Sequence, residues 1–187
     1  MNLYKKNLKK LIKGNSYDPR NEHDACGVGF VASTDGKKLR KIVEFGIQAL
    51  KAVWHRGAVD ADGKTGDGAG IHIEIPEKFF IERIQNAGRQ HKEGTICVGM
   101  IFLPRNDSTL QEKCKTIIEN ELLRKNYYIY RWRQVPVNTK VLGIKAERNR
   151  PEIAQVIFKS NNKNLKGDNL ERDLFVIRKK IEAQSNI

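Results

Sequence analysis

The chain has 187 residues, of which 39% are hydrophobic and 30% are charged, and it contains only 5 prolines. This length corresponds to about one domain and is sufficient to enclose a core. The composition is typical of a soluble globular protein rather than a disordered or membrane protein, and no apolar run approaches the ~20 residues that span a bilayer. We therefore expect a cytoplasmic protein.

The net charge of +13 raises nucleic-acid binding as an alternative function, because lysines and arginines neutralise phosphates. However, the 35 basic residues are spread along the whole chain and interleaved with 22 acidic ones. No DNA- or RNA-binding signature accompanies them. A generally basic, solvated surface is the better interpretation, so we do not expect nucleic acid as a partner.

Residues 1–25 are interpreted as a leader with a linker. Met1–Lys13 is basic and amphipathic, but it lacks the unbroken apolar stretch of a secretory signal. Gly14–Asp24 is polar and prone to turns, with Pro19 in its middle. Ordered structure is expected to begin with Cys26–Ala32, a short apolar run with glycines that predicts a buried strand.

Strand and helix patterns alternate along the rest of the chain. Apolar residues from Leu39 to Trp54 recur at helical spacing and predict a helix with one face against a sheet. Cys97–Leu103 is continuously apolar and predicts a central strand. The other predicted elements are a loop at 60–70, a strand at 71–75, a helix from Pro76, a helix at 110–122, a strand at 127–132, a loop at 161–169 and a strand at 174–177. Together they predict an α+β fold of packed layers.

The three cysteines, Cys26, Cys97 and Cys114, are widely spaced and odd in number, which argues against disulfides and against a metal site. Cys97 and Cys114 lie on apolar stretches and are interpreted as core residues. Removal of the residues ahead of Cys26 would give this cysteine a free α-amine. An α-amine titrates at about 7.7–8.0 and a thiol at about 8.5, so the amine could act as a base toward the thiol. From these residues alone, a buried structural cysteine is the simpler interpretation.

Further motifs decide between these interpretations. The run Asp24–Phe30 (DACGVGF) resembles the processing site of class II glutamine amidotransferases of the glutamate synthase large-subunit type, which cleave a propeptide immediately before the catalytic cysteine. The resemblance covers essentially the whole chain. It continues in family order through His55–Ala58 (HRGA), Thr65–Ile71 (TGDGAGI), Ile75-Pro76 with Phe79-Phe80, Trp132–Val137 (WRQVPV), Leu142-Gly143, Pro151 with Gln155, and Arg172–Arg178.

The resemblance implies both a fold and a reaction. The implied fold is the first part of the four-layer αββα sandwich of N-terminal-nucleophile (Ntn) hydrolases. Residues 1–25 would be a propeptide cleaved after Ala25, and residues 26–187 the N-terminal portion of the amidotransferase domain. Cys26 would attack the carboxamide of L-glutamine, forming a γ-glutamyl thioester and ammonia for glutamate biosynthesis. Gly27 and Arg56 would support the nucleophile, whereas His55 and His72 are interpreted as packed or surface residues.

One departure from the family pattern limits this expectation. In the family an Asn-Gly pair within a His-Asn-Gly-Glu motif stabilises the oxyanion, and this sequence contains no such pair. We therefore expect a truncated domain with little activity alone, whose partners are the rest of glutamate synthase and its small subunit. FMN and an iron–sulfur cluster belong to that complete enzyme, and no cofactor is expected in this chain. Another class II amidotransferase, for purine or amino-sugar synthesis, is the alternative that the leader and Trp132–Val137 argue against.

Overall fold

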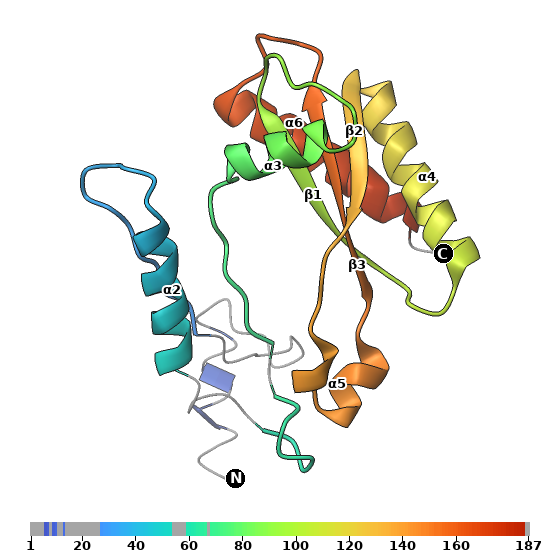
Figure 1. Ribbon diagram of the computed structural model, residues 1–187. Coiled ribbons are helices and arrows are strands. Elements are labelled where there is room, and N and C mark those ends of the chain that lie inside the picture. The colour runs from blue at the N-terminus through green and yellow to red at the C-terminus, as the bar shows by residue number, and fades with distance from the viewer. Residues whose placement is uncertain are drawn as a thin grey trace. The chain divides into compact units, whose positions relative to one another are not determined.

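The computed structural model describes residues 27–53, 59–66 and 68–185, together with residues 6, 7, 9, 10 and 13 (Figure 1). The chain divides into two compact units, residues 1–56 and 57–187. In the first unit, helix α2 (Arg40–Ala52) confirms the predicted helix. None of the residues of α2 is buried, and the expectation that one of its faces lies against a sheet stays a prediction.

The second unit is built on one antiparallel sheet of three strands: β1 (Ile96–Leu103), β2 (Tyr127–Gln134) and β3 (Glu152–Ser160). Their order is β1-β3-β2. The predicted strands at 97–103 and 127–132 are confirmed, but the central position assigned to the first is wrong. β3, which was not predicted, lies in the centre and buries Ala154 through Phe158 continuously, because neighbouring strands and helices cover it on both sides.

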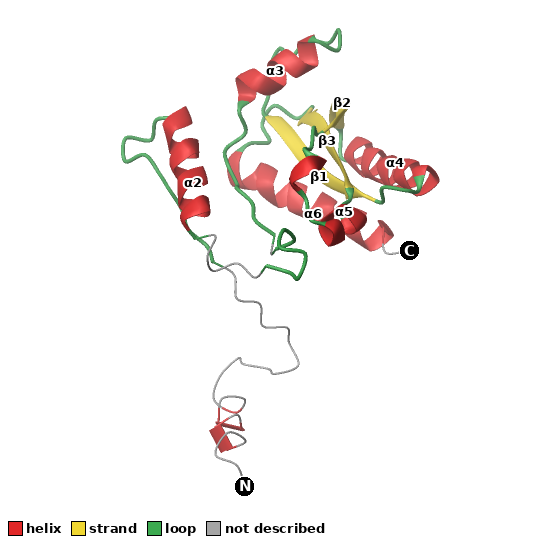
Figure 2. Cartoon of the chain, turned by 60° about the horizontal axis from the view of Figure 1, so that its bottom comes forward, coloured by secondary structure: helices red, strands yellow, loops and turns green. Residues whose placement is uncertain are grey.

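Helices α4 (Ser108–Arg124) and α6 (Gly167–Ser185) pack against one face of this sheet (Figure 2). The Asp107 side chain caps α4 by accepting a hydrogen bond from the Leu110 amide at 2.8 Å. α4 confirms the predicted helix at 110–122. The core on this side contains Cys97, Ile118, Leu122, Tyr127, Val156, Phe158, Leu170 and Ile177.

The predicted strand at 174–177 is wrong, because these residues lie within α6. The core contacts of α6 come from Leu170, Leu174, Ile177 and Ile181, which recur at helical spacing on one face. Phe175 and Val176, between them, are exposed. A run of four apolar residues fits either type of element, and the longer helical pattern decides the outcome here.

Helix α3 (Glu77–Gln85) covers part of the opposite sheet face. Phe80 and Ile84 pack there with Ile96, Tyr130 and Ile157, and the helix follows Pro76 as predicted. Beyond α3, this face carries large apolar side chains that remain open: Met100 is 50% exposed and Phe102 is 65% exposed. The sheet is therefore covered fully on one face and only partly on the other.

Two predicted strands are not formed. Residues 27–32 and 71–75 have no regular secondary structure. Most of their apolar side chains are exposed, most strongly Val28 at 95% and Phe30 at 93%, whereas Ile75 is partly buried against the cluster under α3. A strand needs a neighbour that satisfies its backbone N–H and C=O groups. No such neighbour pairs with either segment in the described part of the chain.

The connection between β2 and β3, residues 135–151, is here called the β2–β3 arm. It contains a 3₁₀ turn, η2 (Thr139–Val141), and the short helix α5 (Ile144–Asn149). The predicted loops at 60–70 and 161–169 carry no helix or strand in their described residues, except that α6 begins at Gly167. None of the helices in the described ranges is both long and apolar enough to cross a membrane.

Candidate functional site

Four residues of the predicted site region lie outside the described residues: the nucleophile Cys26, the cleavage position Ala25, the supporting residue Arg56, and His55, which is interpreted as a packed or surface residue. Gly27 is the first residue of the described segment that follows Cys26, and it is exposed. A Cβ at Gly27 or Gly29 would meet no atom within 4 Å. The space around Gly27 and Gly29 is thus open in the described part of the chain, and the support role of Gly27 stays a prediction.

The two described cysteines are free thiols with different surroundings. Cys97 is buried between the sheet and the helices that cover it, as predicted, and burial raises the pKa of its thiol to about 12. At neutral pH this thiol is protonated and is therefore a poor nucleophile. Cys114 is half-buried on α4. An iron–sulfur cluster requires several converging thiolates, which these two residues do not provide.

The loop at residues 59–66 is closed by its own hydrogen bonds. Val59 and Gly66 form an antiparallel bridge, and the Asp60 amide donates to the Thr65 carbonyl at 2.7 Å. The Asp62 carboxylate accepts from the Thr65 hydroxyl at 2.5 Å and from the amides of Thr65 and Lys64 at 2.7 and 2.9 Å. These bonds hold the pKa of Asp62 well below its usual range, and the bond from the Thr65 hydroxyl has the largest effect.

The β2–β3 arm provides the surface on which this loop rests. Gly143 is buried beneath it, and a Cβ there would lie only 2.5 Å from Asp62 Oδ2 and from Thr65 N. Two residues further on, Lys145 Nζ forms an ion pair with Asp60 Oδ2 at 2.6 Å. The predicted scaffold segment beginning at Thr65 is therefore fixed to Leu142-Gly143, another segment of the family pattern.

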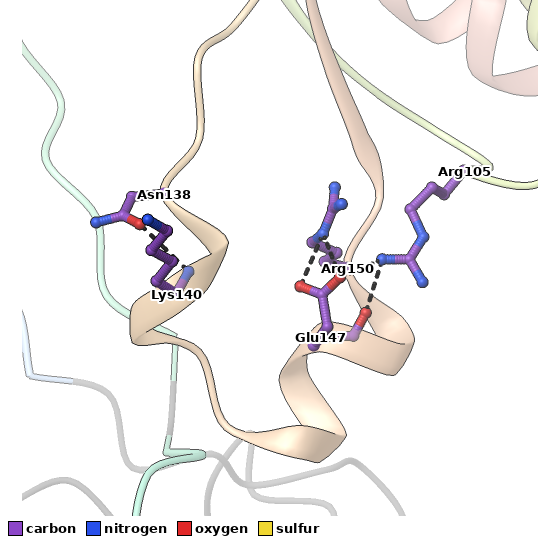
Figure 3. A network of polar contacts seen from close by, with 5 residues as sticks. All are labelled: Arg105, Asn138, Lys140, Glu147 and Arg150. Carbon is purple, nitrogen blue, oxygen red and sulfur yellow. Dashed lines mark hydrogen bonds and ion pairs between the residues drawn. The ribbon is translucent and has the colours of Figure 1, made fainter.

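A second set of contacts ties the arm to the end of β1 (Figure 3). Arg105 donates to the Glu147 carbonyl at 2.9 Å and to its carboxylate at 2.7 Å, and Arg150 Nε donates to the same carboxylate at 2.9 and 3.1 Å. Partial burial raises the pKa of Glu147, but the hydrogen bonds from Arg150 and Arg105 lower it more, so the net shift is downward. At the start of the arm, Asn138 caps η2 by accepting from the Lys140 amide at 3.2 Å.

Several segments that carry the family resemblance meet along β2 and β3. Arg133, in the Trp132–Val137 segment, donates to the Gln155 side chain at 2.6 Å, and the Val135 amide donates to the Ile153 carbonyl at 2.9 Å. The Trp132 indole donates to Glu119 at 2.6 Å. Arg172–Arg178 lies apart from this group, on α6. His72 is exposed, which agrees with the surface position and not with the packed position that were its two predicted alternatives.

Sequence reasoning missed the residues that hold the loop and the arm together. Asp62, Glu147 and the close approach at Gly143 were not singled out. The Asp-x-x-Thr spacing of Asp62 and Thr65 was an available signal, because an Asp side chain commonly accepts from amides two and three residues ahead. Nothing local in the sequence marks Gly143 as the partner of that turn.

Comparison with known proteins gives a consistent result. The sequence model of the family described as Glutamine amidotransferases class-II matches residues 26–187. The chain is 52% identical over 179 residues to the Glutamate synthase [NADPH] large chain of Azospirillum brasilense, covering 96% of this chain and 12% of that protein. It is 44% identical over 167 residues to the Ferredoxin-dependent glutamate synthase of Pyropia yezoensis, covering 89% of this chain and 10% of that protein.

A more distant relative is the Glutamate synthase [NADPH] large chain of Bacillus subtilis, 38% identical over 171 residues, which cover 89% of this chain and 11% of that protein. The chain thus spans about a tenth of the length of the curated relatives that it matches. The family match begins at residue 26. The Azospirillum match covers 96% of the chain and so extends into the residues ahead of Cys26.

Proposed function

Because the chain belongs to the class-II glutamine amidotransferase family, we propose that residues 26–187 form the first part of a domain that releases ammonia from L-glutamine for glutamate synthesis. The observation that carries this proposal is where the family match begins, at Cys26. This is the position expected if the functional domain starts with its nucleophile. The three relatives named above are all glutamate synthases. Their names support the proposal that the released ammonia is incorporated into glutamate.

The proposed nucleophile is Cys26, with its own α-amine as the base. Residues 1–25 are a propeptide, and cleavage after Ala25 converts an amide nitrogen, which is not basic, into an amine that titrates at about 7.7–8.0. The amine takes the proton of the thiol, and the resulting thiolate is the attacking group. Neither of the two described cysteines is a good candidate for the nucleophile, because Cys97 is buried and Cys114 is half-buried.

The reaction proceeds in two balanced stages. The thiolate forms a bond to the side-chain carbonyl carbon of glutamine, and the carbonyl π electrons move to oxygen. When they return, the carbon–nitrogen bond breaks, and the nitrogen leaves as ammonia with the proton from the Cys26 amine. Water then attacks the γ-glutamyl thioester while the amine takes a proton from it, the carbon–sulfur bond breaks, and glutamate is released. Gly27 and Arg56 are proposed to support the nucleophile during both stages.

The oxyanion formed in each stage needs hydrogen-bond donors, and loss of one donor typically costs about 10² to 10³ in rate. The family's Asn-Gly pair does not occur in these 187 residues. We therefore expect the 187-residue chain to release ammonia from glutamine at least ~10²-fold more slowly than a full-length glutamate synthase large chain that carries this sequence. Parallel assays of glutamate and ammonia test the proposal, and equal rates would contradict it. The small subunit and a cytoplasmic location are part of the same proposal.

The αββα arrangement is proposed on the basis of the partly covered sheet. Met100 and Phe102 leave an apolar surface beyond α3, and burying such side chains is worth about 1.5–3 kcal/mol each. The segments 27–32 and 71–75 pair with no strand in the described part of the chain and carry exposed apolar side chains, and we assign both to strands of the second sheet. Amides in both segments should exchange slowly in the full-length chain and quickly in the 187-residue chain. Fast exchange in both would exclude this assignment.

A further inference from the structure

The partly covered face of the sheet is apolar along β1 and charged along β2. Met100, Gln155 and Arg133 are cross-strand neighbours on β1, β3 and β2, so they lie in one row on this face. Arg133 is partly buried and donates to the buried Gln155 side chain at 2.6 Å. Phe102, two residues beyond Met100, lies on the same face. A layer that covers this face therefore meets a guanidinium as well as apolar side chains.

Three arginines gather beside this row and are here called the arginine cluster. Cζ of Arg83, on α3, lies 4.8 Å from the centre of the Phe79 ring, and Cζ of Arg133 lies 5.3 Å from the centre of the same ring. Arg131 joins them by donating to the Arg83 carbonyl at 3.1 Å. None of the ion pairs between described residues includes a member of the cluster.

The charge of the arginine cluster determines what can cover it. Like charges repel one another, and a covering layer removes the water that screens them. Arg83 Nε is already buried and has no hydrogen-bond partner in the described part of the chain. The carboxylate on β3 does not supply one, because Glu152 is three residues from Gln155 and points to the other face, where Gln134 donates to it at 2.5 Å. An apolar layer alone would bury these guanidinium groups without a counter-charge.

We propose that the layer covering this face in the full-length chain places an aspartate or glutamate carboxylate against Arg83 and Arg133. The inference rests on the proposed αββα arrangement and adds the chemistry of the contact between its two sheets. A carboxylate matches the planar fork of a guanidinium and accepts the N–H donors that the sheet leaves without partners. The contact is therefore a buried ion pair at the edge of an otherwise apolar interface.

The test is amide hydrogen exchange at residues 154–158 of β3 in Arg83→Met, which removes the charge and keeps a long apolar side chain. In the 187-residue chain exchange should be unchanged or slower, because the substitution removes a buried donor that has no partner. In the full-length chain it should be at least ~10-fold faster, because a buried carboxylate loses one of its counter-charges. Adding Arg133→Met should raise this to at least ~10²-fold, measured against the same double variant of the 187-residue chain.

Two further variants separate charge from packing. Arg83→Lys keeps the charge, and its exchange in the full-length chain should stay within ~5-fold of that of the unmodified chain. Arg178→Met is the matched control, because Arg178 also lies over a phenylalanine ring, 5.2 Å from the centre of Phe175, but on the exposed side of α6. It should have the same small effect in both chains.

Arg83→Met that exchanges no faster than the unmodified full-length chain would overturn the inference, since methionine suits an apolar layer better than an unpaired guanidinium does. Equal effects of Arg83→Lys and Arg83→Met would overturn it too, because the charge would then be irrelevant. Fast exchange at 27–32 and 71–75 would instead remove the αββα arrangement on which it rests. Ammonia release from glutamine reports separately on the proposed function.

Discussion

Cys26→Ala should abolish the release of ammonia from L-glutamine in the full-length chain. Removing the nucleophile of an enzyme that works through a covalent intermediate costs several powers of ten in rate, and we expect a loss of at least ~10³-fold. The Cys97 thiol cannot take over, because burial raises its pKa to about 12. The measurement is glutamine-dependent ammonia release, accompanied by a melting curve that shows the variant to be folded.

Cys97→Ala is the matched control for this result. Cys97 is only 3% exposed within the core on the α4 and α6 side, so its truncation should destabilise the fold by about 1–2 kcal/mol. The reaction itself should continue at close to the normal rate below the melting temperature. The assignment of the nucleophile is wrong if Cys97→Ala loses ammonia release in a folded protein while Cys26→Ala retains it.

Chains that retain residues 1–25 should be inactive as glutaminases. In such chains the nitrogen of Cys26 is part of a peptide bond and cannot accept the proton of the thiol, and loss of a general base typically costs about 10² to 10⁴ in rate. Residues 1–25 contain more basic than acidic residues, so retained and processed forms of one preparation can be separated by cation exchange. Intact mass then identifies each form, and ammonia release is measured for both.

The outcome that contradicts the role of the amine is an unprocessed form as active as the processed one. A second comparison guards against an indirect effect of the leader, which could block access to the thiol. Iodoacetamide should still alkylate Cys26 in the retained form, but more slowly at neutral pH. Complete protection of Cys26 in the retained form would point to steric blocking rather than a missing base.

The elements predicted correctly share one property: their pattern is decided locally. α2 and α4 carry apolar residues at helical spacing over three or more turns, and β1 and β2 are rich in β-branched and aromatic residues. Such patterns require no knowledge of the neighbours. The order of the strands does require it, which is why Cys97–Leu103 was placed in the centre although Met100 and Phe102 point to an open face.

The errors at 27–32, 71–75 and 152–160 have a common physical origin in partners that are distant along the chain, whereas the error at 174–177 came from a short apolar run within a longer helical pattern. Residues 27–32 and 71–75 have the composition of strands, but they form none without a neighbour to pair with. The central strand β3 depends on pairing with β1 and β2, and its mixture of Gln155 with apolar residues gave no clear period. Short segments of this kind are determined by tertiary context more than by their own residues.

In the candidate site, too, some features are predictable from local sequence and others depend on contacts between distant segments. Motifs identified Cys26, Ala25 and Arg56 by resemblance, and these assignments remain proposals because the residues lie outside the described ranges. The structure contributes what motifs could not: the contact of Thr65 and Asp62 with Gly143, which joins segments far apart in the sequence. Ordinary backbone angles at Gly143 give no sign of this contact.

The central claim is that the Cys26 sulfur forms the bond to the substrate. It is tested most directly by treating the processed full-length chain with an electrophilic diazoketone analogue of glutamine and mapping the modified peptide. We predict one modified atom, the Cys26 sulfur, in a peptide whose first residue is Cys26, with loss of activity in proportion to labelling and protection by L-glutamine. Inactivation with the label on any other residue, and with Cys26 unmodified, would contradict the account.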